Sequence, residues 1–461
     1  MSTLLPMIAY VCLPLFWVGL LRLARVSLRK ATIPSVLVYF IITFQYIGLP
    51  VLYFKLDDYR SPDIESTEVV GDIFLLTSTA TTLVIIGFLA SRVALRTDFA
   101  TRALTRHHPE PANTTRLDTL GGVALTMLGA ATLVIYIMKI GPSNLALVAA
   151  IEDPSDTLGI NILRSHMGNA FEGRYYLYKL LMRDGLQIGS STLFAVALLR
   201  PSKRRLLLFL VSAVVATLSF TIATEKGPLI NYLAGLMLVG LFIRSNGFLL
   251  RRWLFVTALA ALGAVALLYM AFMGASDPLD AALQATSRLF TGQIEPLYHY
   301  LVIFPQQHDF LLGRSMPNPA GLLPFEHYPL TIEVMSMVHP WHLREGVVGS
   351  MPTFFWGELW ANFGTVGVLL VPAFVGFAVC WIADTLDRFS PTPLTLAAIA
   401  WFSLHVKDLS NTPASNYIID AYATAVVIWL IGFHLLPSPM LSRALTNTTL
   451  ALKHAHSNDP Q

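Results

Sequence analysis

A polar stretch, 274–357, interrupts an otherwise apolar chain and gathers residue types that bind anions and move protons. Among its basic and imidazole side chains we single out Arg288, Arg314, Arg344 and His339. Guanidinium groups pair bidentately with phosphate oxygens, and imidazole exchanges a proton near neutral pH. The stretch therefore predicts a site for a diphosphate with an acid–base group beside it.

Two further basic side chains, Arg164 and Lys226, lie outside this stretch. Lys226 falls in the tight turn Thr224-Glu-Lys-Gly-Pro228 between two apolar segments, and charge at a membrane boundary is retained only with a partner or a function. The alternative is that such side chains extend to lipid head groups. We expect the diphosphate-binding set to be Arg164, Lys226, Arg288, Arg314 and Arg344.

Two side chains are candidates for a base that removes the proton of a hydroxyl group: Glu358 and His339. Glu358 lies in Trp356-Gly-Glu-Leu-Trp360, where an apolar segment begins, and burial there would raise its pKa. The N-terminus of a helix would also favour this negative charge, without any chemistry. Glu295 is a weaker candidate for the same role.

The sequence patterns do not predict a metal, a nucleotide or a nucleic acid as ligand, so we expect no cofactor. His339-Pro-Trp-His342 places two imidazoles three residues apart, but Pro340 opposes a regular helix and no convincing further ligand completes a metal site. The pair Asp57-Asp58 is best explained as a solvated surface. The sequence also lacks a glycine-rich phosphate loop, which disfavours an ATP-driven transporter.

The composition requires a lipid environment for most of the chain. Hydrophobic residues make up 55% of the 461 residues and charged residues 13%, where soluble domains carry about 25% charged residues. The mean hydropathy is +0.61 and the formal net charge +3. Cys12 and Cys380 lie in apolar runs, which argues against a disulfide framework.

Apolar segments near the length of about 20 residues that crosses a bilayer predict an all-α polytopic membrane protein. They are 1–21, 33–54, 72–94, 120–140, 181–199, 206–224, 228–243, 253–274, 357–383, 394–406 and 417–436. We therefore expect about eleven (10–12) transmembrane helices. Residues 1–436 would form a single bundle, followed by a cytoplasmic tail, 437–461.

Basic residues concentrate in alternate connections, as the positive-inside rule predicts for loops on the cytoplasmic side. The first segment precedes its basic residues, which is the reverse of a signal peptide, so we expect the N-terminus outside and the C-terminus inside. This orientation places two long loops outside the cytoplasm, 141–180 and 274–357. We expect both to contain short helices.

Three parts of the chain resemble the Wzy-type polymerases that join the oligosaccharide repeat units of bacterial O-antigen. They are Arg164 followed by Arg174-Tyr-Tyr-Leu-Tyr; the Lys226 turn, where the family usually has arginine; and the late stretch with Leu311-Leu-Gly-Arg-Ser-Met-Pro-Asn-Pro and Pro352-Thr-Phe-Phe-Trp-Gly-Glu-Leu-Trp-Ala-Asn-Phe-Gly-Thr-Val-Gly367. The resemblance covers most of the chain from residue 141 onward. The Arg-x10-Gly repeats of some members are not found after Arg164, Arg288 or Arg314.

The resemblance implies inverting, metal-independent glycosyl transfer at the periplasmic face of the bacterial inner membrane. A growing glycan on undecaprenyl diphosphate would be the donor, and a hydroxyl group of a lipid-linked repeat unit the acceptor. Arg164, Lys226 and Arg288 would bind the diphosphate, with Arg344 next. The expected partners are these lipid-linked oligosaccharides, the bilayer and a chain-length regulator protein.

Other functions stay open at this point. An O-antigen ligase would use the same donor and transfer the glycan to lipid A core, and His339 is compatible with that reaction. A flippase of lipid-linked oligosaccharides is a different class, but flippases tend to have short loops and internal repeats. A membrane protein with a purely structural role is the remaining alternative.

Overall fold

The computed structural model describes residues 4–95, 116–153, 156–171, 178–249, 263, 277–318, 321–341, 349–387, 389 and 391–417. In these residues the secondary structure is helical, apart from an isolated β-bridge between Lys30 and Phe248. The predicted spans 253–274 and 417–436 lie outside the described residues, except for residues 263 and 417. The predicted tail, 437–461, lies wholly outside them.

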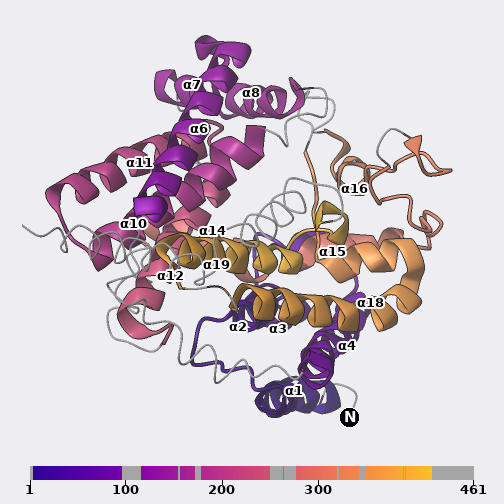
Figure 1. Cartoon of the computed structure of the whole chain (residues 1–461). Helices are drawn as coiled ribbons and strands as arrows, with labels where there is room; N and C mark the ends of the chain where they lie inside the picture. Colours follow the sequence, from indigo (N-terminus) through magenta and orange to yellow (C-terminus); the bar gives the residue numbers. More distant parts are fainter. Residues whose placement is uncertain are drawn as a thin grey trace, which may run out of the picture.

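Within the described residues, helices follow one another along the chain (Figure 1). The first half contains α1 (Leu4–Leu23), α2 (Ile33–Ile41), the π-helix η1 (Ile42–Tyr46), α3 (Leu49–Tyr53), η2 (Ser61–Asp63), α4 (Thr67–Leu95), α6 (Arg116–Ile140), η4 (Pro142–Asn144), α7 (Ala146–Glu152), α8 (Thr157–Asn169), the π-helix η5 (Leu180–Gly185), α10 (Leu186–Leu199), α11 (Lys203–Thr221) and α12 (Lys226–Ser245). The second half contains α14 (Pro278–Phe290), α15 (Ile294–Ile303), α16 (Leu330–Val338), α18 (Phe355–Asp387), α19 (Pro393–Val406), η7 (Lys407–Ser410) and η8 (Ala414–Tyr417).

Every predicted span within the described residues coincides with helix. Six helical segments are long and apolar enough to cross a membrane: Ile33–Tyr53, Thr67–Leu95, Arg116–Ile140, Lys203–Thr221, Gly227–Ser245 and Phe355–Asp387. This is the architecture of a helical membrane protein. The count of about eleven crossings stays a prediction. Short helices also occur in both predicted long loops, α7 and α8 in the first and α14, α15 and α16 in the second.

Local sequence signals explain where several helices begin. The side chains of Thr32, Asp277 and Thr392 each accept a hydrogen bond from a backbone N–H group in the first turn of α2, α14 and α19. A proline follows within the first two positions of each helix. Such caps satisfy N–H groups that have no partner inside the helix, and proline fits there because it lacks this donor.

Glycine lets α4 and α18 pack backbone to backbone. A Cβ atom on Gly87 would lie 2.0 Å from the carbonyl oxygen of Ala373, and one on Gly376 would lie 2.1 Å from that of Val84. Neither position has room for a side chain. Close approach through small residues is the usual way in which helices associate within a membrane.

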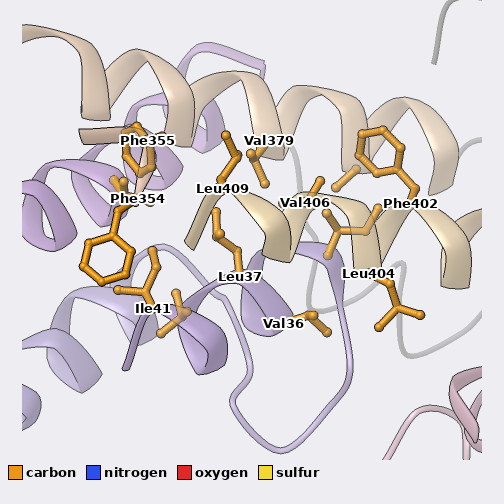
Figure 2. Close-up of a cluster of buried hydrophobic side chains, with 14 of the residues drawn as sticks. Val36, Leu37, Ile41, Phe354, Phe355, Val379, Phe402, Leu404, Val406 and Leu409 are labelled. Atoms are coloured by element: carbon orange, nitrogen blue, oxygen red, sulfur yellow. The ribbon is translucent and has the colours of Figure 1, made fainter. Parts of the chain in front are cut away.

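The buried core joins segments that are far apart in the sequence. In Figure 2, Leu37 and Ile41 of α2 lie beside Phe355 and Val379 of α18 and Val406 of α19. All of these side chains are buried. The N-terminal and C-terminal parts of the chain therefore share one apolar core.

The chain turns back on itself within α18, at Gly364 (Figure 1). Its backbone (φ +58°, ψ −144°) is open to glycine but strained for other residues. A Cβ atom on Gly367 would lie 2.7 Å from the carbonyl oxygen of Leu359, whereas residues eight apart in a straight helix are separated by about 12 Å. The predicted span 357–383 is therefore not one straight helix, because piece 355–363 packs against the start of the longer piece 365–387.

Three basic connections meet at one end of the bundle. Lys30 forms the β-bridge with Phe248, and its Nζ atom lies 4.5 Å from the centroid of the Phe248 ring. The Arg92 guanidinium group donates a hydrogen bond to the carbonyl oxygen of Leu23. The positive-inside rule assigns these connections, after α1, α4 and α12, to the same side of a membrane.

Candidate functional site: a cluster of charged side chains

Ionisable side chains from three segments lie close together around the start of α15. We call them the charged cluster: Arg60, Asp63, Arg288, Glu295, His299 and His339. They come from the loop before α4, from the α14–α15 region and from the residue after α16. The last two segments belong to the polar stretch 274–357.

An ion pair between Arg60 and Glu295 is at the centre of the charged cluster. The distance from Arg60 Nη1 to Glu295 Oε2 is 2.6 Å. The two segments are held in this register by Tyr298, whose hydroxyl oxygen accepts the backbone N–H groups of Glu65 and Ser66 at 3.1 and 2.9 Å. Glu295 and Tyr298 are three residues apart on α15, so they present their side chains to the same loop.

The environment of Glu295 combines burial with charges of both signs. Burial raises the pKa of Glu295, Arg60 opposes this shift, Asp63 adds to it and Arg288 opposes it more weakly. Arg288 therefore lies within electrostatic reach of this carboxyl group, although its own side chain is exposed at the end of α14. The site brings two guanidinium groups to a carboxyl group that can become neutral.

Two imidazole rings complete the charged cluster. Burial lowers the pKa of His299 to about 4; Asp63 opposes this shift and His339 adds to it. His299 is thus neutral at pH 7, and its buried Nε2 atom has no hydrogen-bond partner within the part of the chain that the structure describes. The His339 ring stacks edge-on against Trp341, with ring centroids 4.9 Å apart.

The structure places the predicted diphosphate-binding residues in different parts of the protein. Arg288 belongs to the charged cluster. Arg164 is exposed on α8, which packs against α7, and Arg314 is exposed in a turn after α15. Lys226 begins α12, but its side chain is not described. Arg344 lies outside the described residues.

The two predicted bases also have different surroundings. His339 lies in the charged cluster, whereas Glu358 is buried on piece 355–363 of α18 with 1% of its surface exposed. Glu358 Oε1 accepts the Ser315 hydroxyl at 2.8 Å, and Oε2 accepts the backbone N–H of Ser415 at 2.8 Å. The Asn362 amide donates to Ser315 Oγ at 2.8 Å. Glu358 therefore ties three segments together with both of its oxygens.

The sequence interpretation did not include Arg60 and His299. Arg60 is a basic residue in a connection predicted to lie outside, which is the signal used for the other arginines. Glu295 and His299 are four residues apart, so they lie on one face of a helix. Neither signal joins Arg60 to Glu295, because 235 residues separate them.

A second group of ionisable side chains lies where η5 meets α12 and α19. Arg183 Nη2 is 2.7 Å from Glu225 Oε2, and Asp184 Oδ1 is 3.2 Å from His405 Nε2. The sequence interpretation did not include this group either. The available signal was charge within apolar spans, since Arg183 and Asp184 fall inside 181–199 and His405 inside 394–406.

The charged cluster can bind an anion through its guanidinium groups and exchange protons through its carboxyl and imidazole groups. Within the described residues, no group of three or more His, Cys, Asp or Glu side chains is arranged to hold a metal ion. The residues and their geometry are the ground on which a function is assigned. Comparison with known protein families, with curated proteins and with solved structures found no match for this chain.

Proposed function

We propose that this protein is a glycosyltransferase that joins oligosaccharide repeat units carried on undecaprenyl diphosphate, acting at the periplasmic face of the bacterial inner membrane. The observation that supports this function is the charged cluster, in which two guanidinium groups, two carboxyl groups and two imidazoles lie close together beside apolar helices. A diphosphate on a lipid tail needs both features, because its head is anionic and its tail apolar.

In this proposal Arg288 and Arg60 bind the departing diphosphate. The acceptor hydroxyl oxygen attacks the anomeric carbon from the face opposite the diphosphate, and the electron pair of the breaking C–O bond moves to the phosphate oxygen. Fixed positive charge stabilises the developing negative charge without reorganising during the reaction. In the structure Arg60 forms an ion pair with Glu295. Because burial raises the pKa of Glu295, protonation of this carboxyl group is favoured and would free Arg60 to bind the diphosphate.

His339 is the proposed base, which takes the proton from the acceptor hydroxyl group. Of the two predicted bases, Glu358 fits this role less well because both of its oxygens already accept hydrogen bonds. His299 stays neutral and contributes a hydrogen bond rather than charge. Arg344, five residues after His339, is proposed as a further phosphate contact. The reaction needs neither a metal nor a nucleotide, because the diphosphate is already a good leaving group.

The proposed orientation follows from the basic connections that meet after α1, α4 and α12. This end faces the cytoplasm, so the N-terminus is periplasmic and the C-terminus cytoplasmic. A chain-length regulator is the proposed protein partner on the periplasmic side. The polyprenyl tails of the substrates lie against the apolar outer surfaces of the helices.

The test is extension of lipid-linked repeat units by purified protein in vesicles without an ion gradient. We expect glycans of many repeats, and activity without a gradient excludes transport as the function. If folded protein left the lipid-linked repeat units as single repeats, the proposal would be contradicted.

An O-antigen ligase is the second candidate, because it would use the same donor and the imidazoles of the charged cluster suit either reaction. Glycan profiles of a deletion strain separate the two functions. Loss of a polymerase leaves single repeats on the lipid A core, whereas loss of a ligase leaves polymer that is not attached to the core. If the deletion strain accumulated polymer that is not attached to the core, the protein would be a ligase and not a polymerase.

A further inference from the structure

Asp184 and His405 face each other inside the bundle, and the proposed glycosyl transfer does not use them. Asp184 Oδ1 lies 3.2 Å from His405 Nε2, and both side chains are more than nine-tenths buried. Trp401 Nε1 donates to the same Asp184 oxygen at 3.1 Å, and the Trp401 ring packs on His405 with centroids 4.1 Å apart. The pair joins η5, which leads into α10, to the end of α19.

The hydrogen-bond geometry fixes the number of protons in this pair. His405 Nδ1 lies 2.8 Å from the carbonyl oxygen of Trp401, which can only accept, so Nδ1 carries a hydrogen. Neutral imidazole has only that one N–H, and an ionised carboxylate has none. With both groups in those forms, an Nε2 atom without a hydrogen would lie 3.2 Å from a carboxylate oxygen, with no proton to attract the two atoms to each other. One additional proton is therefore needed between Nε2 and Asp184 Oδ1.

We propose that Asp184 and His405 are a proton-binding site, which holds one proton between them and so joins α19 to η5. The proton can reside on the imidazole or on the carboxyl group, and the pair has no net charge in either case. A net charge at this depth would be costly in free energy. Asp184 Oδ2 accepts no hydrogen bond from any described residue, so the contacts of this carboxyl group are made through Oδ1.

Among the described residues, the charged groups that flank this pair in the sequence have partners of opposite sign. Arg183, which precedes Asp184, pairs with Glu225 from the start of α12. Lys407, which follows α19, pairs with Asp408, and its Nζ atom lies 5.6 Å from the ring centroid of Phe40 on α2. These neighbours balance one another, so the proton itself has to neutralise the Asp184 carboxylate.

Loss of this proton has a direct structural consequence. An ionised Asp184 would then face the lone pair of His405 Nε2, and the contact between α19 and η5 would weaken. This inference is independent of the proposed glycosyl transfer, since it concerns the fold.

The test is nuclear magnetic resonance of the wild-type protein with ¹⁵N-labelled histidine, in lipid nanodiscs at pH 6.5, together with infrared detection of protonated carboxyl groups. We expect either an imidazolium with both nitrogens protonated or a protonated carboxyl band, and loss of that signal in Asp184→Asn. A neutral His405 beside an ionised Asp184 would overturn the proposal. Asp72→Asn, at an exposed aspartate on α4, is the matched control and leaves the signal in place. His405→Gln serves to assign the histidine signal.

Discussion

Glu358 and Glu295 are both buried carboxyl groups in the late part of the chain, but their partners differ. Glu358 is held by neutral donors, the Ser315 hydroxyl and the Ser415 backbone N–H. Glu295 is held by the charged Arg60 and lies within electrostatic reach of Arg288 and Asp63. The difference indicates that burial alone does not mark a reactive carboxyl group. A reactive carboxyl group is marked instead by ionisable neighbours, such as guanidinium groups, that can also bind an anionic ligand.

The largest expected effect is on the Glu358 side of the comparison. Glu358→Leu leaves the Ser315 hydroxyl and the Ser415 N–H buried without an acceptor, so we expect a loss of about 3 kcal/mol in unfolding free energy. Thermal unfolding in detergent measures it. Glu358→Gln is the control, because its amide oxygen can accept from Ser415 while Ser315 Oγ accepts from its amide nitrogen. If Glu358→Leu had normal stability but no activity, Glu358 would be a reactive carboxyl group and not a structural one.

Substitution of Arg288 tests the other half of the comparison, the charged cluster around Glu295. Removing the exposed guanidinium in Arg288→Ala should lower kcat/KM for lipid-linked repeat units on the order of 100-fold, because a fixed charge on the leaving group is lost. Its stability should stay within about 0.5 kcal/mol. Arg288→Lys keeps the charge without the bidentate fork and should be intermediate. The matched control is Arg204→Ala, an exposed arginine in the first turn of α11, and equal losses in both arginine variants would contradict a specific role for Arg288.

The lowered pKa of His299 predicts that the folded protein loses stability as the pH falls below neutral. Its pKa is about 4 in the folded protein and 6.5 in the unfolded chain, so between these values the unfolded chain binds more protons and stability falls as the pH falls. The contribution is complete above pH 6.5 and about 2 kcal/mol smaller at pH 5. His299→Gln should remove this dependence, as measured by chemical unfolding between pH 4 and 7. An unchanged acid decline in that variant would assign it to other groups.

The smallest effects are expected at Arg164 and Arg314, which are exposed and lie outside the charged cluster. Arg164→Ala and Arg314→Ala should each change stability by less than about 0.5 kcal/mol and leave long glycans in a complemented deletion strain. Gel profiles of the glycan measure this outcome. Loss of long glycan in either variant would extend the site beyond the charged cluster and restore the broader set predicted from the sequence.

Helix positions were predictable because transfer of an apolar segment into lipid depends on that segment alone. The predicted span 72–94 lies within α4 (Thr67–Leu95), and 120–140 lies within α6 (Arg116–Ile140). The reversal at Gly364 was not predicted, because it depends on the packing of Gly367 against Leu359 and of Gly364 against Phe310. A hydropathy pattern contains no information about such contacts.

Arg288 and His339 could be selected from the sequence because basic and imidazole residues are conspicuous in a polar stretch between apolar segments. Their shared surroundings could not be predicted, since these depend on Arg60 and Asp63 of a distant loop. The same holds for Asp184 and His405, whose proton count follows from distances between atoms on different helices.

The sequence by itself determined that this chain is helical, suited to a bilayer and charged at particular connections, because hydropathy and net charge are properties of individual segments. Tertiary structure alone decided which carboxyl group meets neutral donors and which meets guanidinium groups. That choice depends on the directions in which side chains point after the helices have packed, and direction is a property of the assembled bundle.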